Sequence, residues 1–185
     1  MRLVKKRLFA IVLASGLGTS VGARGQMFED FEMKPDLRWD FVADTVMGGV
    51  STGSVKFLTE GDVAFARMTG TVSTQNRGGF IQFRRKFEDR LPDEVTGVRL
   101  VVRGNAERYF VHLRTTGAML PWQYYQSGFE SKPGWQEIRL PLSSFDSSGS
   151  MLRNTPRAGT IISVGVVAYG RDYDALIDVR EIDFY

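Results

Sequence analysis

Cysteine is absent from this sequence of 185 residues, and histidine occurs only once, as His112. Without cysteine, the chain has no disulfide framework, no thiolate metal site and no cysteine nucleophile. A single histidine excludes a metal site built from several histidines, and a serine triad would have to use His112 as its base. The sequence therefore predicts no metal and no cofactor, and it favours binding over catalysis.

The start of the chain lacks an apolar run long enough to cross a bilayer comfortably, since its run covers only residues 8–18. Four basic residues precede this run and small residues end it at 21–23, which is the pattern of a secretory signal peptide. We predict a signal peptide over residues 1–23 and a single domain over residues 24–185, located in the periplasm or secreted. An uncleaved membrane anchor is the alternative.

An excess of basic residues is also missing from the predicted mature domain. The whole chain has a formal charge of +3 and a pI near 9.3. Removing the four basic residues of the leader leaves 20 of the 24, against 21 acidic residues, for a formal charge of −1. Because nucleic-acid-binding domains are usually basic, we predict no nucleic-acid partner.

Amphipathic helices are absent after the leader, and short alternating segments separated by glycine and proline take their place. We expect an edge strand at 26–36 anchored by Phe28 and Phe31, a hairpin of 54–59 with 63–69, and a bulge near 180–181. About ten short strands of this kind predict an all-β fold, an antiparallel β-sandwich of the jelly-roll type. The other expected strands begin at Trp39 or cover residues 80–87, 98–103, 108–115, 135–142, 161–169 and 176–185. Residues 143–160 are expected to form a long loop, or a short helical turn followed by a loop.

The stretch at residues 39–51, WDFVADTVMGGVS, has apolar side chains that lead into a glycine pair. Glycine at these positions permits backbone angles or close approaches that a side chain would forbid. We interpret the segment as a fixed turn or bulge, with a loop that presents backbone amides at the rim as the alternative. A phosphate loop is not predicted, because neither Lys-Ser, Lys-Thr nor a helix follows the glycines.

The same stretch resembles the signature of the complex I intermediate-associated protein family, and later blocks follow in the family's order. The resemblance implies a galactose-binding-like jelly roll and, for the mitochondrial members, an assembly factor that holds intermediates of respiratory complex I, without a catalytic role. The matching positions that we assign to the structural motif are Trp39, Met47, Gly48, Gly49, Ser51, Gly78, Gly79 and Trp135. Further matches are Val42, Asp44, Phe80, 102–104, Tyr109, Phe129, 140–142 and Phe145.

Two groups of side chains are candidates for binding. If strands 98–103 and 108–115 pair, Arg103 lies near His112 and Arg114 on a cationic face suited to anionic or hydroxylated ligands, although a solvated outer sheet face would alternate in the same way. The aromatic stretch at 121–129 has the chemistry that stacks on sugars or anchors a protein, with core packing as the alternative. The candidate binding residues are Asp44, Arg103, Tyr109, His112, Arg114, Trp122, Tyr124 and Tyr125.

Carboxylates gather in the first and last expected strands, at Glu29, Asp30, Glu32, Asp178 and Asp183. Oxygen ligands for a structural calcium are conceivable there, but no recognisable loop spacing supports such a site. We interpret these side chains as solvated charges at a sheet edge.

We predict a non-enzymatic binding protein that resembles complex I assembly factors and holds a protein partner in the cell envelope. A membrane subunit of a respiratory complex is the partner that the resemblance favours. The alternative is a module that binds carbohydrate or another small ligand. An enzyme that uses His112 as a base is a third class, with little in the sequence to support it.

Overall fold

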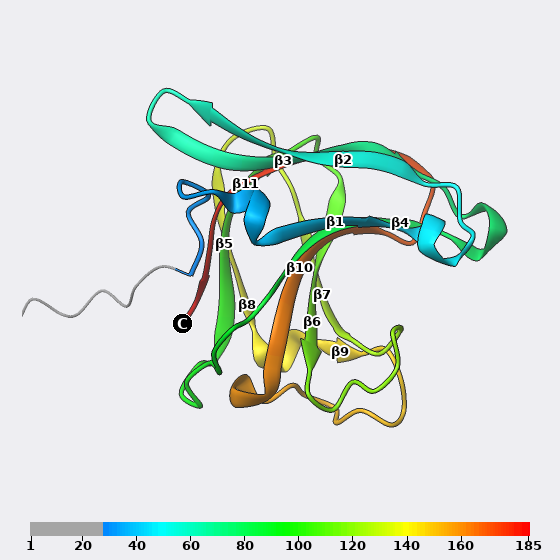
Figure 1. The fold of residues 1–185 in the computed structure, drawn as a ribbon, viewed down its shortest axis with the longest axis vertical. Coiled ribbons are helices and arrows are strands. Elements are labelled where there is room, and N and C mark those ends of the chain that lie inside the picture. Colours follow the sequence, from blue (N-terminus) through cyan, green and yellow to red (C-terminus); the bar gives the residue numbers. More distant parts are fainter. Residues whose placement is uncertain (1–27) are drawn as a thin grey trace, which may run out of the picture.

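Two antiparallel sheets enclose one apolar core in the computed structural model, which describes residues 28–185 (Figure 1). The six-stranded sheet has the order β1 (Trp39–Ala43), β4 (Phe80–Lys86), β10 (Ile161–Tyr169), β6 (Arg108–Thr115), β7 (Tyr125–Glu130) and β9 (Asp146–Ser147). The five-stranded sheet has the order β2 (Thr52–Glu60), β3 (Val63–Val72), β11 (Tyr173–Phe184), β5 (Gly97–Gly104) and β8 (Gln136–Pro141). The predicted antiparallel β-sandwich of the jelly-roll type is confirmed.

The described part has five short 3₁₀ turns. The first, η1 (Pro35–Leu37), precedes β1, and the other four connect strands: η2 (Asp44–Met47), η3 (Gln75–Arg77), η4 (Leu142–Ser144) and η5 (Ala158–Thr160). Within residues 28–185, no helix combines the length and the apolarity needed to cross a bilayer. The predicted signal peptide at 1–23 lies outside the described residues.

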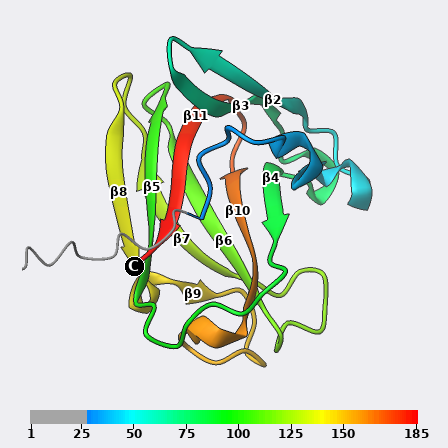
Figure 2. The same cartoon turned by 60° about the vertical axis from the view of Figure 1, so that its left-hand side comes forward.

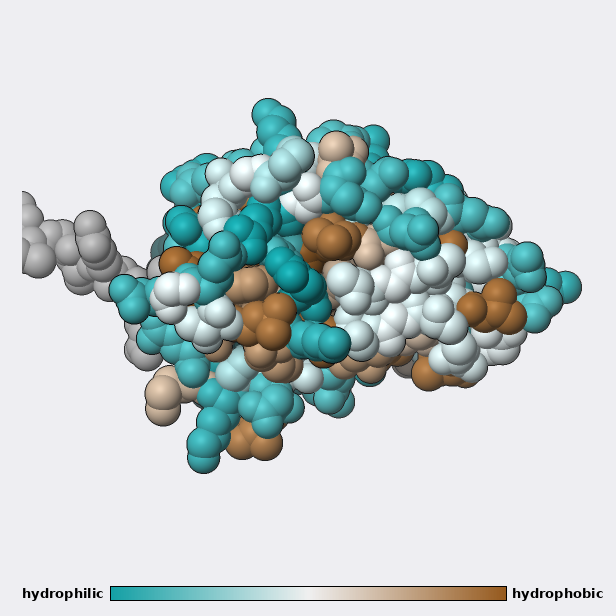
Figure 3. Space-filling view, turned by 90° about the horizontal axis from the view of Figure 1, so that it is seen from above, coloured by the Kyte–Doolittle hydropathy of each residue, from teal (hydrophilic) through white to brown (hydrophobic). Residues whose placement is uncertain are grey.

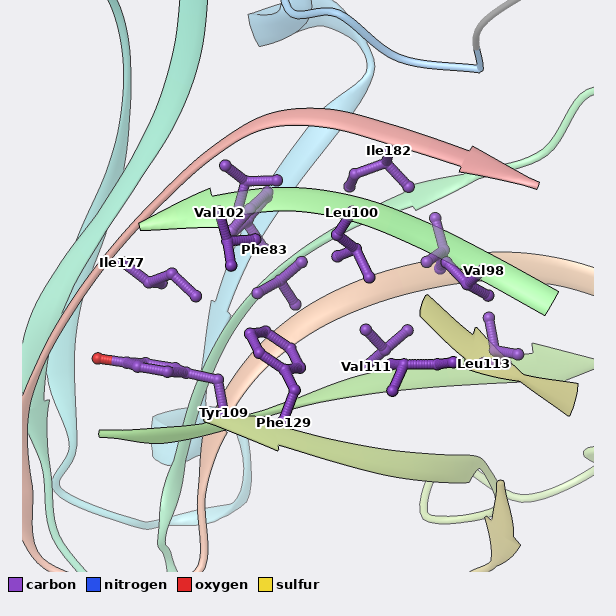
Figure 4. Packing of buried hydrophobic residues seen from close by; sticks show 14 of the residues in the cluster. Phe83, Val98, Leu100, Val102, Tyr109, Val111, Leu113, Phe129, Ile177 and Ile182 are labelled. Atoms are coloured by element: carbon purple, nitrogen blue, oxygen red, sulfur yellow. The ribbon is translucent and has the colours of Figure 1, made fainter. Parts of the chain in front are cut away.

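The alternation of side chains in β6 shows why these segments form half-buried strands. Tyr109, Val111 and Leu113 are fully buried, whereas Phe110 and His112 point to the other face and are only half-buried. Successive residues of a strand point to opposite faces of its sheet, so one parity supplies the core. Figure 4 shows these inward side chains of β6 packed against Leu100, Val102 and Ile177 of the opposite sheet, among others.

Several local predictions are confirmed. β2 and β3 form the expected hairpin, and Gly61 at its turn has the positive φ of +61° that favours glycine. In β11, the pairing with β5 shifts register between Val179 and Glu181, where the bulge is expected. Turned by 60°, the sandwich shows β8, β5 and β11 on one side and β10 and β4 on the other (Figure 2).

One prediction about the arrangement of strands is wrong, and one condition for a joint binding face is not met. The segment at 26–36 is not a strand in its described part, because it makes only one isolated bridge, between Glu29 and Ile182. Strands β5 and β6 do not pair, although they follow one another in the sequence. They belong to opposite sheets, because β5 pairs with β11 and β8 whereas β6 pairs with β10 and β7.

The interpretation of Glu29 and Asp178 as solvated edge charges is also wrong, since both side chains are buried. Glu29 accepts hydrogen bonds from Arg38, Arg85 and the indole of Trp39 at 2.8 Å each. Asp178 joins Arg67 and Arg103 across neighbouring strands at 2.7 and 2.8 Å. Burial is tolerated because each carboxylate gains paired cations and several hydrogen bonds. Among residues 28–185, no cluster of three or more His, Cys, Asp or Glu side chains could hold a metal ion.

The surface seen from above, over the β2–β3 hairpin, is mostly hydrophilic or neutral, with separate hydrophobic patches (Figure 3). On this face, hydrophobic side chains do not merge into one continuous area. The feature that stands out among the described residues is instead a cleft on the outer face of the six-stranded sheet.

Candidate functional site

A cleft of about 770 Å³ lies on the outer face of the six-stranded sheet. Its floor is formed by outward side chains of three neighbouring strands, among them Gln82 and Arg84 of β4 and His112 and Arg114 of β6. The strand between them, β10, contributes Gly165, which lies opposite both Arg84 and His112 in the pairing register. Gly165 has no side chain, and its neighbours on β4 lean over it, because a Cβ there would lie 3.2 Å from Oε1 of Gln82 and 3.3 Å from Cβ of Arg84.

Two loops form the rims of the cleft. On one side η2 presents Val46 and Met47, which are 72% and 60% exposed. On the other side the loop between β6 and β7 presents Pro121 and Trp122, the latter 60% exposed. The cleft therefore combines a polar floor with apolar and aromatic rims.

Aromatic rings are stacked at one end of the floor. The rings of His112 and Tyr124 are parallel within 13°, with centroids 4.1 Å apart. Tyr169 meets His112 edge-on, with centroids 6.0 Å apart. Together with Trp122, these side chains offer ring faces and hydroxyl groups to a ligand in the cleft.

The His112 ring is neutral at physiological pH. Burial lowers its pKa from 6.5 to about 3, and the side chain of Gln126 on the adjacent strand opposes this shift only in part. Burial, together with the nearby Tyr169 hydroxyl, raises the pKa of Tyr124, so this phenol stays protonated. A neutral imidazole has one donor and one acceptor nitrogen, and a pKa of about 3 makes it a poor general base near neutrality.

Unpartnered polar atoms gather at this floor. Five buried side-chain nitrogen or oxygen atoms in residues 28–185 have no hydrogen-bond partner, and four of them belong to this face: Nε of Arg84, Nε2 of His112, Nε of Arg114 and Oε1 of Gln126. Buried polar groups in folded proteins are normally bonded, so such a concentration calls for an explanation. A polar ligand, reached by small movements of the covering side chains, would supply the missing partners.

The structure brings four of the predicted binding residues together and separates the other four. His112, Arg114, Trp122 and Tyr124 all line the cleft. Tyr109 and Tyr125 have the opposite parity and lie in the core, while Arg103 lies on the outer face of the other sheet with its guanidinium 4.5 Å from the centre of the Trp135 ring. Asp44 is completely buried beside the η2 rim.

The cleft is also lined by Gln82, Arg84 and Tyr169, which are not among the binding residues predicted from the sequence. The alternation in residues 80–87 already puts Gln82 and Arg84 on one polar face. The local sequence pattern does not predict that β10 lies between β4 and β6 and brings their polar faces side by side.

A family model described as complex I intermediate-associated protein 30 (CIA30) matches residues 29–174. The chain belongs to the CIA30 family. Among curated proteins, none matches the sequence significantly.

Solved structures with a similar fold include carbohydrate-binding modules and parts of larger enzymes. The family 11 carbohydrate-binding module of the cellulase Lic26A-Cel5E of Clostridium thermocellum aligns with a TM-score of 0.69 at 17% identity, covering 86% of this chain and 92% of that one. The module from the same organism in complex with a β-1,3-1,4-mixed-linked tetrasaccharide gives 0.68 at 15%, covering 85% and 93%. An exo-β-agarase gives 0.56 at 9%, covering 86% of this chain and 25% of the enzyme. At these identities the similarity shows a shared fold.

The stretch by which this CIA30 chain resembles its family forms a clasp around Asp44. One carboxylate oxygen accepts the Ser51 amide at 2.9 Å, and the other accepts the Ser51 hydroxyl and the Gly79 amide at 2.5 Å each. Burial alone would raise the pKa of Asp44, but these bonds hold it below its usual value of 3.8. A Cβ at Gly49 or Gly78 would overlap this carboxylate. The glycines therefore let two loops close on Asp44, and Val46 and Met47 project from the clasp toward the cleft.

Proposed function

We propose that this CIA30-family chain is a non-enzymatic binding protein whose cleft holds a sugar chain. The observation that carries the proposal is the set of aromatic rings, Trp122, Tyr124 and Tyr169, beside a floor of polar side chains in one open cleft. Proteins hold sugars by placing aromatic rings on the faces of the sugar and by bonding its hydroxyl groups with polar side chains.

The similarity in fold supports this proposal. The family 11 module in complex with a β-1,3-1,4-mixed-linked tetrasaccharide has a TM-score of 0.68 with this chain. A sandwich of the same architecture therefore accommodates a short sugar chain in another protein. Because only 15% of positions are identical, the support for sugar binding comes from the side chains of this chain's own cleft.

The chemistry of the cleft favours binding without turnover. Hydrolysis of a glycosidic bond normally needs a pair of carboxylates that flank it. Among the described residues that line the cleft there is no Asp or Glu, and His112 has a pKa too low for a general base at neutral pH.

Affinity electrophoresis of the purified protein through gels that contain soluble polysaccharides tests the proposal. We expect at least one sugar polymer to retard the wild-type protein. Trp122→Ala should remove most of this retardation, because the sugar can no longer stack on the exposed indole ring. Leu37→Ala is the matched control, since Leu37 is 75% exposed and lies on η1, outside the cleft. Equal mobility of the wild type in all gels, with and without sugar, would reject the proposal.

A protein partner is a second candidate, which the family membership and the η2 rim favour. We infer that Val46 and Met47, both well exposed, contact this partner, and that the protein acts in the cell envelope after export, with a membrane subunit of a respiratory complex as the partner. Affinity capture from detergent-solubilised envelope should then enrich one membrane complex. The double variant Val46→Ser/Met47→Ser should lose it, while Met151→Ser, at another exposed methionine, should retain it.

A further inference from the structure

Two half-buried arginines of the cleft lack the carboxylate partners that the other half-buried arginines of the described chain have. Three arginines line the cleft, Arg77, Arg84 and Arg114, and none of them lies within 4.0 Å of an Asp or Glu of residues 28–185. Arg84 and Arg114 are half-buried, and every other half-buried arginine of the described chain is paired. Those paired arginines are Arg38, Arg67, Arg85, Arg99, Arg103 and Arg180.

Nearby acidic residues do not neutralise this charge. Asp40 lies opposite Arg84 in the pairing of β1 with β4, and Asp146 lies opposite Gln126 in the pairing of β7 with β9. Both are exposed, neither lines the cleft, and neither is within 4.0 Å of an arginine in the part of the chain described. The lining therefore has three cations and no anion, although residues 24–185 together have a formal charge of −1.

The hydrogen bonds of the two half-buried arginines are also incomplete. The Nη2 of Arg114 donates to the carbonyl oxygens of Ala118 at 3.4 Å and Leu120 at 3.1 Å. The Nε of Arg114 has no partner, and neither has the Nε of Arg84. A guanidinium keeps its charge at any physiological pH, so proton loss cannot remove the need for a partner. An anionic ligand group would supply that partner.

The positions of Arg84 and Arg114 fit separate groups on one extended ligand. Arg84 is on β4 and Arg114 on β6, on opposite sides of β10, where Gly165 lies opposite Arg84 and Ser163 lies opposite Arg114. Two strand spacings across the sheet and two residues along it place their Cα atoms roughly 12 Å apart. Gly165 lies between Arg84 and His112, and the stacked rings of His112 and Tyr124 line the same cleft. A sugar ring in the cleft could thus present an acidic group to one or both guanidinium groups.

We infer that the cleft binds an acidic saccharide, a chain of sugars that carries carboxylate groups, as uronic acids do. This inference rests on the proposed sugar-binding function and specifies its ligand class. A planar carboxylate matches the fork of two N–H groups that a guanidinium offers, which gives direction as well as charge to the contact. Carboxylates on the sugar replace the protein carboxylates that the other half-buried arginines have.

The experiment compares one sugar chain with and without its charge. Isothermal titration calorimetry with oligogalacturonate and with its fully methyl-esterified form varies the carboxylate while it retains the sugar backbone. We expect binding of the acid to be tighter by about tenfold or more, as for hydrogen bonds to charged groups, and to weaken as salt rises. Arg84→Gln and Arg114→Gln should each remove much of this preference, whereas Arg90→Gln, at an exposed arginine outside the cleft, should not.

Each contrary outcome has a separate meaning. Equal affinity for the acid and its ester would overturn the acidic-ligand inference and leave sugar binding intact. Tighter binding of a sulfated glycan than of any uronate would overturn the choice of carboxylate. Equal binding of polyglutamate, which has carboxylates but no sugar, would reject a saccharide site. Absence of binding to every acidic and neutral glycan would reject the proposed function itself.

Discussion

The imidazole of His112 and the phenol of Tyr124 lie face to face across the β6–β7 pair, with their centroids 4.1 Å apart. His112 points outward from β6, and Tyr124 is the residue immediately before β7, the strand that pairs with β6. The stack covers part of the floor of the cleft with a flat aromatic surface. Side chains that stack in this way are rigid, so they are ready to receive a second flat surface such as a sugar ring.

Tyr124 and Tyr125 provide a matched pair for mutation, since they are neighbours in sequence but lie in different parts of the fold. Tyr124 lines the cleft, whereas Tyr125 is only 2% exposed and belongs to the core. We expect Tyr124→Ala to weaken ligand binding at least tenfold with a small effect on stability. Tyr125→Ala should lower the free energy of unfolding by about 3–5 kcal/mol, as for other large aromatic side chains truncated in cores. Urea denaturation and calorimetry separate the two effects, and the reverse pattern would contradict the assignment of the cleft.

His112 should remain neutral well into the acid range. Its pKa is lowered from 6.5 to about 3 by burial, so the unfolded chain takes up the proton first as the pH falls. The contribution of the neutral ring to stability is therefore complete above pH 6.5 and is lost as the pH falls toward 3. Because His112 is the only histidine, one set of imidazole NMR signals reports its titration. A midpoint near 6.5 would mean that the floor of the cleft is open to water.

The clasp of Asp44 should be important for stability. Asp44→Ala would leave the buried amides of Ser51 and Gly79 without their acceptor, and we expect a loss of about 2–4 kcal/mol in the free energy of unfolding. Thr45→Ala, at the exposed neighbouring position, is the control and should change stability by less than about 0.5 kcal/mol. Urea midpoints measure both variants. Unchanged stability of Asp44→Ala would show that the two loops close without this carboxylate.

Glu29 should make the fold sensitive to acid. Burial alone would raise its pKa, but hydrogen bonds from Arg38, Trp39 and the Phe31 amide outweigh burial and hold the pKa below the usual 4.5. A lowered pKa in the folded state means that the carboxylate stabilises fully above about pH 4.5 and that this contribution is lost as the pH falls through the lower value.

The variant Glu29→Gln tests this relationship. It should be less stable than the wild type at pH 7, and the difference should shrink in urea titrations at successively lower pH as the wild-type carboxylate becomes protonated. Glu32→Gln is the control, because Glu32 is exposed and should leave the profile unchanged. A difference that stays constant from pH 7 to pH 3 would contradict a charged Glu29.

Local pattern was sufficient for much of the fold. Alternation predicts 108–115 and 161–169 with the ends that the structure gives to β6 and β10, and a change of parity predicts the bulge in β11. The segment at 26–36 could not be predicted in this way. Its few alternating residues resemble a strand, but its position depends on the ion pairs of Glu29 with Arg38 and Arg85, the latter 56 residues away.

The composition and the period-two alternation of this sequence determine that the chain forms strands, and which side chains of each strand share a face. They separate His112 and Arg114 from Val111 and Leu113 without any knowledge of neighbours. Only the tertiary structure decides which faces meet. Arg84, not Arg103, accompanies His112, because β4 and β6 both pair with β10, a strand that follows them late in the chain. Such pairing is set by long-range packing of the two sheets, which no local pattern records.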